Sequence, residues 1–369
     1  MASVTLANVS KSYGEVCATH DLSFHCDDGQ MLALLGPSGC GKTSTLKMIA
    51  GIEHIDDGEI HIGERLVNDL SPGQRNIAMV FEDYALYPNM NVFDNIAFPL
   101  KLRKWPRREI CKRIDPVIEL LGLQDQRNSD VRRLSGGAQQ RVSIGRALVR
   151  EPELIIFDEP LSHLDADQKV QLRTEIRRLQ MATGLTGILV THDQTEAVAM
   201  ADQVAVMDHG ELQQIATPQS LYHQPANLFV ANFIGEPPMN LLPVRLEVEG
   251  PHHRLVGAGW SIAPEPSLAE RIGSIAAGME LILGLRPEMI CVSEANSGCP
   301  DLQGTLLWQE YRGDAHVLTI DLANHGTKLV VECRQQLGLV TGAAVGLKIS
   351  TTALNLFDAT NGRNLMLGA

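Results

Sequence analysis

The chain has 369 residues, which suggests two or three domains, and its 44% hydrophobic and 20% charged residues are those of an ordinary globular protein. The formal net charge of −13 argues against a protein that wraps nucleic acid by charge alone, so we expect no nucleic-acid partner. Seven scattered cysteines without a CxxC pair argue against a disulfide framework or zinc site and favour a reducing compartment.

The first 51 residues predict short strands that lead into a glycine loop and a helix. Residues 4–10 and 22–26 alternate as strands do, and a turn at Asp27, Asp28 and Gly29 precedes the apolar run 31–35. An apolar run without polar interruption is typical of a buried strand. The segment 36–51, GPSGCGKTSTLKMIAG, follows at once and predicts a loop that opens a helix ending at Gly51.

This loop matches the phosphate-binding pattern GxxxxGK[ST] in the required place, after a buried strand and before a helix. Its glycines let backbone N–H groups approach phosphates, and the helix N-terminus favours negative charge. Lys42 is expected to hold the β- and γ-phosphates of ATP, and the Thr43 hydroxyl to ligate Mg²⁺. The alternative is a tight glycine turn followed by a chance Lys-Thr pair. The candidate nucleotide-binding residues of this segment are Gly36, Ser38, Gly39, Cys40, Gly41, Lys42, Thr43 and Ser44.

Cys40 lies inside this loop. We expect a maleimide on Cys40 to block ATP hydrolysis and MgATP to protect the thiol.

Short apolar runs that end in polar residues recur along the chain, separated by helical stretches. They lie at 76–81, 153–158, 186–193 and 203–208 and predict a mostly parallel sheet with helices on its faces. The run at 153–158 delivers Asp158 and then Glu159. A strand that ends in a carboxylate suits a Walker B magnesium site, with Asp158 acting through Mg²⁺ or its water and Glu159 polarising the attacking water. The alternative is an ordinary acidic turn.

The stretch from Val92 to Arg150 differs from the rest, because it is rich in helical patterns and interrupts the α/β core. It includes the basic run 101–113, which is more often a solvated helix face than an anion site. Three prolines and a glycine in 235–244 then indicate a linker. Short strand-like runs follow to the end of the chain and predict an all-β domain of small Greek-key or barrel character.

Several further motifs in fixed order carry a resemblance that covers essentially the whole chain. The segment 134–142, LSGGAQQRV, follows the phosphate loop and precedes the acidic strand end, SHLDA at 162–166 and THDQTEA at 191–197. Together they resemble the nucleotide-binding subunit of an ABC transporter. The resemblance implies an α/β P-loop NTPase core with a helical insertion at about 90–150, plus a C-terminal all-β (OB-like) domain. We expect the first domain at 1–235 and the second at 236–369.

The resemblance also implies residue roles. Two subunits of this family pair head-to-tail, so the N–H groups and hydroxyl of Ser135, Gly136 and Gly137 would complete the ATP site of the partner, with Ser135 and Gly137 acting in trans. His192 would be the switch histidine that contacts the γ-phosphate. Asp165 fits the aspartate of the D-loop, and Tyr13 fits the aromatic residue that stacks on adenine.

The second half of the chain resembles the carbohydrate importers of the maltose and glycerol-phosphate type. The similar segments are 234–244, 282–290, 309–320 and 354–365, and 81–104 resembles the Q-loop and helical region. This implies a second ATPase subunit, identical or different, and two transmembrane permeases that dock at the helical region. It also implies an indirect extracytoplasmic solute-binding protein. The C-terminal domain would stabilise the dimer and in some members binds a regulator.

No window of the sequence approaches the roughly 20 apolar residues that span a bilayer, and the opening residues lack the features of a signal peptide. We therefore expect a subunit held at the cytoplasmic face of the membrane by its permeases.

Three positions depart from the family pattern. Glu82 stands where the Q-loop has glutamine, Ala138 where the signature has glutamine, and His163 where the D-loop has asparagine. Glu82 offers Mg²⁺ an oxygen but adds negative charge beside a polyanion and has no donor when ionised. We expect altered rather than lost coupling between ATP hydrolysis and transport; neutral drift is the alternative.

The leading hypothesis is an ATPase that powers import of a carbohydrate, a polyol or a sugar derivative; another small solute remains open. A soluble ABC ATPase of translation or DNA repair would carry tandem ATPase domains or a coiled-coil insertion, and this sequence has neither. A partly degenerate partner in a heterodimer is the third hypothesis, which Glu82 keeps open.

Overall fold

The computed structural model describes residues 2–249, 252–265, 272, 275–294, 300–322, 326–335, 337–351 and 354–367. The chain forms two compact units, Met1–Pro218 and Gln219–Ala369. The boundary that the proline-rich stretch predicts at 235/236 falls inside the second unit. The buried Arg286 explains this, because its guanidinium donates to the carbonyls of Tyr222 and Ile234 and ties the segment before the boundary to the β unit.

The first unit is built on a central sheet with the strand order β10-β9-β3-β8-β7-β6. The strands β9, β3, β8, β7 and β6 run parallel, and β10 pairs antiparallel with β9. The strands are β3 (Met31–Leu35), β6 (Ile77–Val80), β7 (Leu154–Asp158), β8 (Thr186–Thr191), β9 (Gln203–Asp208) and β10 (Glu211–Ala216). The predicted, mostly parallel sheet is confirmed.

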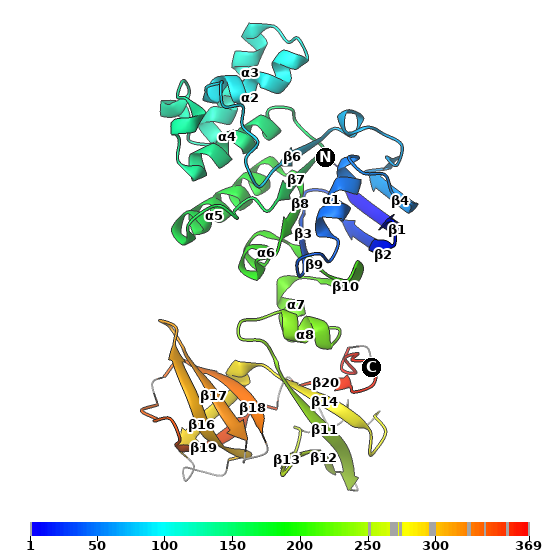
Figure 1. The fold of residues 1–369 in the computed structure, drawn as a ribbon, viewed down its shortest axis with the longest axis vertical. Helices are drawn as coiled ribbons and strands as arrows, with labels where there is room; N and C mark the ends of the chain where they lie inside the picture. Colours follow the sequence, from blue (N-terminus) through cyan, green and yellow to red (C-terminus); the bar gives the residue numbers. More distant parts are fainter. Residues whose placement is uncertain are drawn as a thin grey trace. The chain divides into compact units, whose positions relative to one another are not determined.

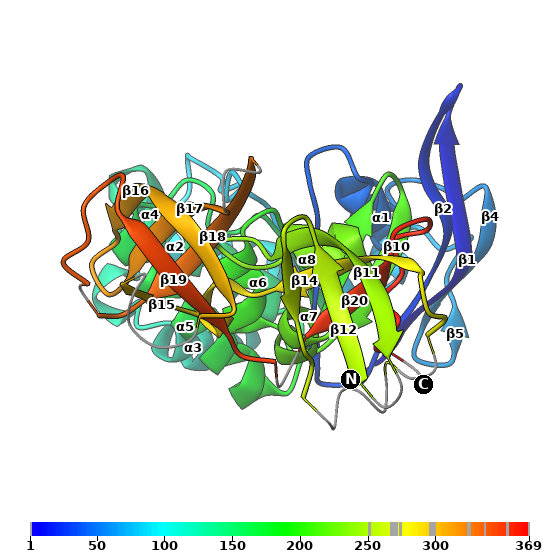
Figure 2. The same cartoon turned by 90° about the horizontal axis from the view of Figure 1, so that it is seen from below.

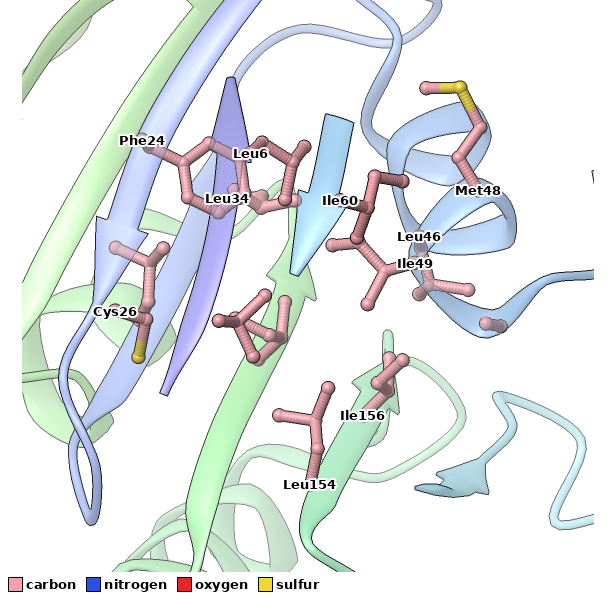
Figure 3. Packing of buried hydrophobic residues seen from close by; sticks show 14 of the residues in the cluster. Leu6, Phe24, Cys26, Leu34, Leu46, Met48, Ile49, Ile60, Leu154 and Ile156 are labelled. Carbon is pink, nitrogen blue, oxygen red and sulfur yellow. The ribbon is translucent and has the colours of Figure 1, made fainter. Parts of the chain in front are cut away.

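An antiparallel sheet of order β2-β1-β4-β5 completes the sheets of this unit, and Figure 2 shows β1, β2 and β4 running side by side. Its strands are β1 (Val4–Tyr13), β2 (Val16–Cys26), β4 (Asp57–Ile62) and β5 (Arg65–Leu66). A hydrophobic core joins both sheets to helix α1 (Lys42–Ala50) (Figure 3). Alternate residues of β3 and β7, such as Leu34 and Ile156, point into this core, as strand geometry requires.

Helices α5 (Ala166–Thr183) and α6 (Gln194–Met200) belong to the α/β part of the unit, and Ile176 and Leu179 of α5 lie beside Ile155 and Phe157 of β7. Three further helices pack against one another as the helical insertion that the sequence predicts (Figure 1). They are α2 (Val92–Leu102), α3 (Arg107–Leu120) and α4 (Gly136–Leu148). Short 3₁₀ turns lie at Pro72–Gln74, Gln124–Gln126 and Val131–Arg133.

Helix α7 (Pro218–His223) starts at the last residue of the first unit. The second unit continues with α8 (Leu228–Phe233) and two antiparallel sheets around one apolar core. The first sheet holds β13 (Trp260–Ile262), β12 (His252–Gly257), β11 (Asn240–Glu249), β14 (Glu280–Leu285) and β20 (Asn355–Asp358). The second holds β15 (Ile290–Glu294), β19 (Ala344–Ile349), β16 (Leu302–Tyr311), β17 (His316–Leu322) and β18 (Thr327–Cys333), with a 3₁₀ turn at Pro287–Met289 before β15. The predicted all-β domain is confirmed. Within the described residues, no helix has the length and apolar character needed to cross a membrane.

Candidate active site at the carboxyl edge of the sheet

Four parallel strands deliver the predicted site residues to one edge of the central sheet. Leu35 at the end of β3 pairs with Thr191 at the end of β8, Asp158 of β7 pairs with Val190, and Val80 of β6 pairs with Phe157. The residues that follow are the phosphate loop, His192, Glu159 and Glu82 respectively. The register of the sheet therefore brings together segments that lie more than a hundred residues apart in sequence.

The glycines of the loop are required by backbone contacts. A Cβ on Gly36 would lie 2.3 Å from the carbonyl oxygen of Met207, and one on Gly41 would lie 2.4 Å from that of Ala18. Gly39 and Gly41 adopt left-handed backbone, with φ of 82° and 102°, which side chains disfavour. The loop is thus clamped between β2 and the end of β9, while Ser38 and Gly39 at its tip remain exposed.

Helix α1 starts directly from this loop, and no side chain caps its N-terminus. Its first free N–H groups therefore face the loop, where an anion is favoured. Thr43 is exposed and Ser44 half-buried at this start. Lys42 is buried, and its ammonium donates to the carbonyls of Gly36 at 2.7 Å and Pro37 at 2.9 Å. A cation thus lies within the concave side of the loop.

The Cys40 side chain joins the hydrophobic core, and its sulfur accepts from the Lys42 ammonium at 3.7 Å. Its side chain is 3% exposed. Burial raises the pKa of the thiol above its ordinary value, although the Lys42 ammonium opposes this. A buried, protonated thiol is a poor nucleophile, so we expect a maleimide to modify Cys40 slowly. Only the backbone of Cys40 is available to a ligand.

Glu159 and His192 form the second feature of the edge. The Glu159 Oε2 atom lies 3.1 Å from Nδ1 of His192. The Glu159 backbone is left-handed, with φ of 44°, and its N–H donates to the carbonyl of Val190 at 2.9 Å. A non-glycine residue in this conformation is uncommon and costs free energy, and such residues concentrate at functional sites. The strained turn directs the carboxylate toward the histidine.

Asp158 is half-buried at the end of β7. Burial raises the pKa of its carboxyl above the ordinary value, the charges of Glu159 and Glu82 raise it further, and Lys47 lowers it. Three carboxylates thus influence one another at this edge, which is an arrangement that a cation would stabilise.

The turn that carries His192 is held by a buried network that the sequence interpretation missed. Thr191 donates to Glu196 at 2.7 Å, and the Asp193 N–H donates to the Thr191 hydroxyl at 3.0 Å. Glu196 is buried and pairs with Lys169 at 3.3 Å. Asp193 also caps helix α6. The spacing of Asp193 and Glu196, three residues apart before an apolar run, is a capping signal that could have identified this network.

Glu82 follows β6 and meets His163 from the turn after β7, with 3.6 Å between Oε1 and Nε2. Two and three residues further on, Tyr84 and Ala85 have left-handed backbone with φ of 61° and 44°. Arg146 of α4 donates to both of their carbonyls, at 3.0 Å and 2.6 Å. Arg146 was not among the predicted residues, and only the fold reveals that it anchors this segment.

The segment 135–137 is not brought to the phosphate loop of its own chain. Ser135 is exposed and caps α4 by accepting from the Ala138 N–H. A Cβ on Gly136 would meet Leu164, Tyr84 and Gln168, none of which belongs to the loop, and one on Gly137 would meet open space. The N-terminus of α4 is therefore a second helix start with accessible backbone.

Asp165 has a structural use that explains its position. It caps α5 by accepting from the Gln168 N–H at 2.9 Å, and its other oxygen accepts from the Gln168 side chain at 2.6 Å. The pair has the spacing of a capping box, so the sequence held this signal.

Tyr13 lies at the end of β1, pairs with Val16 and is 43% exposed. Strand β2 continues from Val16 to Ala18, which contacts the phosphate loop, so Val16 lies roughly 7 Å from that contact along the strand. Tyr13 thus offers an exposed ring near the loop, and its stacking on adenine stays a prediction.

Comparisons with known proteins identify the family of this chain. The ABC transporter family matches residues 19–162, and the TOBE domain matches residues 283–357. The trehalose/maltose import ATP-binding protein of Thermococcus litoralis is 50% identical over 296 residues, which cover 78% of each chain. The sn-glycerol-3-phosphate import ATP-binding protein of Agrobacterium fabrum is 40% identical over 365 residues, 99% of this chain and 95% of that one. The chain belongs to the ABC transporter ATP-binding proteins.

A solved structure supports the same assignment. The dimeric, post-hydrolysis ATP-binding cassette MJ0796, bound to ADP and Pi, aligns with a TM-score of 0.51 and 29% identity over 58% of this chain and 98% of its own. Membership of this family implies nucleotide binding and ATPase activity coupled to import. The predicted family and fold class are confirmed.

This ABC protein also has a groove beside the Glu82 segment, with a volume of about 290 Å³. It is formed by the end of β6, the segment after it, α2 and α4. Its lining is mainly apolar and aromatic, with two arginines: Ala78, Met79, Phe81, Ala85, Tyr87, Phe98, Pro99, Leu102, Arg146, Ala147 and Arg150. Phe81 and Ala85 flank Glu82, so the groove and the site share one segment. In the basic run, Lys101, Lys112 and Arg113 pair with carboxylates, as expected for a solvated helix face.

Proposed function

We propose that this protein is the ATP-hydrolysing subunit of an importer for a carbohydrate, polyol or related sugar derivative. The observation that carries the proposal is the carboxyl edge of the sheet, where the Lys42 loop lies beside the Glu159–His192 pair. One group holds phosphate and the other can take a proton. The imported solute class follows from the named substrates of the relatives, which are trehalose, maltose and glycerol 3-phosphate.

Each residue has a role in hydrolysis. The N–H groups of the loop and of the start of α1 bind the phosphates, and Lys42 leaves its loop carbonyls to donate to the β- and γ-phosphates. Tyr13 stacks on adenine. Glu159 orients the attacking water and accepts its proton, and His192 holds Glu159 in place and donates to the γ-phosphate.

The donor set fits Mg²⁺. Thr43 supplies a hydroxyl, Asp158 and Glu82 supply carboxylates, and oxygen ligands with retained waters suit this ion. Among the described residues no cluster of three or more His, Cys, Asp or Glu side chains could hold a metal by itself. Mg²⁺ is therefore expected to be held by these few donors together with the phosphates, where it would neutralise charge developing on the phosphate oxygens.

The accessible start of α4 supports a dimeric site. Ser135 and Gly137 offer a hydroxyl and free N–H groups. They do not lie against the phosphate loop of their own chain, because the neighbours of Gly136 belong to other segments. The anion-binding group they form is suited to the γ-phosphate bound by a second subunit, with Asp165 at the start of α5 near that contact. ATP binding would then close two subunits on each other.

The groove beside Glu82 suits a helix of a permease. It is concave, mostly apolar and aromatic, and carries Arg146 and Arg150, as helix-binding grooves do. Two permeases would hold the ATPase pair at the cytoplasmic face of the membrane, and an extracytoplasmic binding protein would deliver the solute. Because Phe81 and Ala85 line the groove and flank Glu82, movement of the docked helix would reach the ATP site directly.

Glu159→Gln tests the proposal. The amide keeps the shape of the side chain but cannot accept the proton, so hydrolysis should fall about 10²- to 10⁴-fold. ATP binding should remain, and the variant should accumulate as an ATP-bound dimer in size-exclusion chromatography. Glu119→Gln, on the exposed face of α3, is the matched control and should keep native activity. Native hydrolysis by Glu159→Gln, or failure of the native chain to bind ATP, would overturn the proposal.

Glu82 and His163 favour a second candidate, in which this chain is the less active member of a heterodimer. The isolated native chain distinguishes the two, since a homodimer hydrolyses ATP alone and a degenerate partner does so only after another ATPase is added.

A further inference from the structure

Two of the positions that depart from the family pattern contact each other. Glu82 follows β6, and His163 lies in the turn between β7 and α5, yet their side chains approach to 3.6 Å. That distance is within ion-pair range and too long for a hydrogen bond. A glutamine and an asparagine at these positions would both be neutral. Here a carboxylate has replaced one and an imidazole that can donate an N–H has replaced the other.

The surroundings give Glu82 a reason to need such a partner. Its charge acts on Asp158, which also feels Glu159. A third carboxylate at this edge is unfavourable by itself and would also repel the phosphates of ATP. The Nε2 atom of His163 faces the Glu82 carboxylate and can hold it in place.

Both partners sit on anchored turns. Arg146 fixes the Glu82 segment through the carbonyls of Tyr84 and Ala85. On the other side, the Ser162 N–H and hydroxyl donate to the Glu159 carbonyl at 3.3 Å and 3.1 Å. His163 therefore follows a residue bonded directly to Glu159. The contact between Glu82 and His163 therefore links the segment that lines the groove to the turn that holds Glu159.

We propose that His163 is a positioning residue that holds the Glu82 carboxylate, so that the groove segment and the Glu159 turn respond together. The proposal deepens the proposed ATPase function and rests on it. His163 does not touch the reacting atoms. Its effect on nucleotide binding passes through Glu82, whose carboxylate it contacts at 3.6 Å.

The proposed role and a role confined to surface packing predict different effects of breaking the pair. The two side chains are 48% and 57% exposed, and pairs this open contribute little to stability. Thermal unfolding should therefore hardly change when the pair is broken, and the effect should appear in nucleotide affinity. A role confined to surface packing would leave nucleotide affinity unchanged.

A double-mutant cycle with His163→Ala and Glu82→Gln tests the pair in the full chain. The readouts are the dissociation constant of a fluorescent ATP analogue with magnesium and the KM and kcat of hydrolysis. In His163→Ala the unheld carboxylate should raise the dissociation constant and KM about 3- to 10-fold, with a smaller change in kcat. Adding Glu82→Gln should return both to within about 2-fold of Glu82→Gln alone, because the charge that needed a partner is gone.

His61→Ala is the matched control, since His61 pairs with Glu59 at 2.9 Å on β4, away from this edge. It should leave the dissociation constant unchanged. Additive effects in the cycle, or native affinity in His163→Ala, would overturn the positioning role of His163. The proposed ATPase function would still stand if the native chain bound ATP. If the native chain bound no nucleotide, the proposed function would fail first.

Discussion

The two ends of the central parallel sheet are built from the same strands, yet they differ in how far their polar groups are paired with one another. At the amino end, polar groups satisfy one another. The Met31 N–H donates to Asp202 at 2.8 Å, and Arg177 of α5 pairs with the same carboxylate. Gln180 donates to the carbonyls of Gly29 at 2.8 Å and Leu185 at 2.7 Å.

At the carboxyl end, polar groups are gathered without full mutual satisfaction. The start of α1 has no side-chain cap, Asp158 feels two neighbouring carboxylates, and Glu159 has left-handed backbone. Each of these features costs stability, and each suits a bound polyphosphate and its cation. The difference teaches that the stability of this sheet is built at one end and its chemistry at the other. Substitutions at the two ends should therefore have separable effects.

Lys42→Ala should have the largest effect on ATP binding and a much smaller effect on stability. The substitution removes the cation expected to donate to the phosphates, and a hydrogen bond between charged groups is worth about 1.5–3 kcal/mol. ATP affinity should fall about 10- to 150-fold, measured by titration with a fluorescent nucleotide. The urea midpoint of unfolding should change little by comparison. A large loss of stability with intact affinity would contradict the separation of the two ends.

Asp202→Asn should do the reverse. Burial alone would raise the pKa of Asp202, but hydrogen bonds from Arg177 and the Met31 N–H outweigh it, so the pKa is lowered. A lowered carboxyl pKa gives stability that is present above the unfolded value of about 3.9 and is lost as the pH falls through the folded value. At neutral pH the variant should lose about 1.5–3 kcal/mol of unfolding free energy by urea titration. Its disadvantage relative to the native chain should shrink below about pH 4.

The second measurement on Asp202→Asn is its ATP affinity, taken at low temperature so that the variant is folded. It should match the native value. Weaker ATP binding with unchanged stability would show that the amino end also serves the site.

Much of this arrangement could be predicted from the sequence because it depends on local patterns. Apolar runs that end in polar residues predict parallel strands, and parallel strands share a carboxyl edge, so the meeting of Lys42, Asp158 and His192 follows. What the sequence could not provide is contact between segments that no pattern joins. Glu82 and His163 were both recognised as departures, but only the turn geometry after β6 and β7 reveals that they meet.

Burial was the other limit. The two compact units divide at Pro218/Gln219, earlier than the boundary predicted at 235/236, because Arg286 binds the carbonyls of the segment before the proline-rich stretch from within the β unit. The loop pattern includes Cys40 among the candidate nucleotide-binding residues, but a sequence pattern does not give side-chain burial, and the Cys40 side chain is 3% exposed.

The smallest expected effect concerns the reactivity of Cys40. It tests whether the side of the phosphate loop that packs on the hydrophobic core opens to solvent. The thiol is 3% exposed and its pKa is raised by burial, whereas Cys17 on β2 is exposed. With a maleimide at neutral pH, Cys40 should react at least about 10-fold more slowly than Cys17, as read by mass spectrometry of each peptide, because modification requires both opening and deprotonation. MgATP should slow it further by holding the loop closed, while Cys291 in the second unit should react at an unchanged rate. Equal rates for Cys40 and Cys17 would mean that the loop opens readily on its inner side, and the carboxyl end would then be mobile as well as polar.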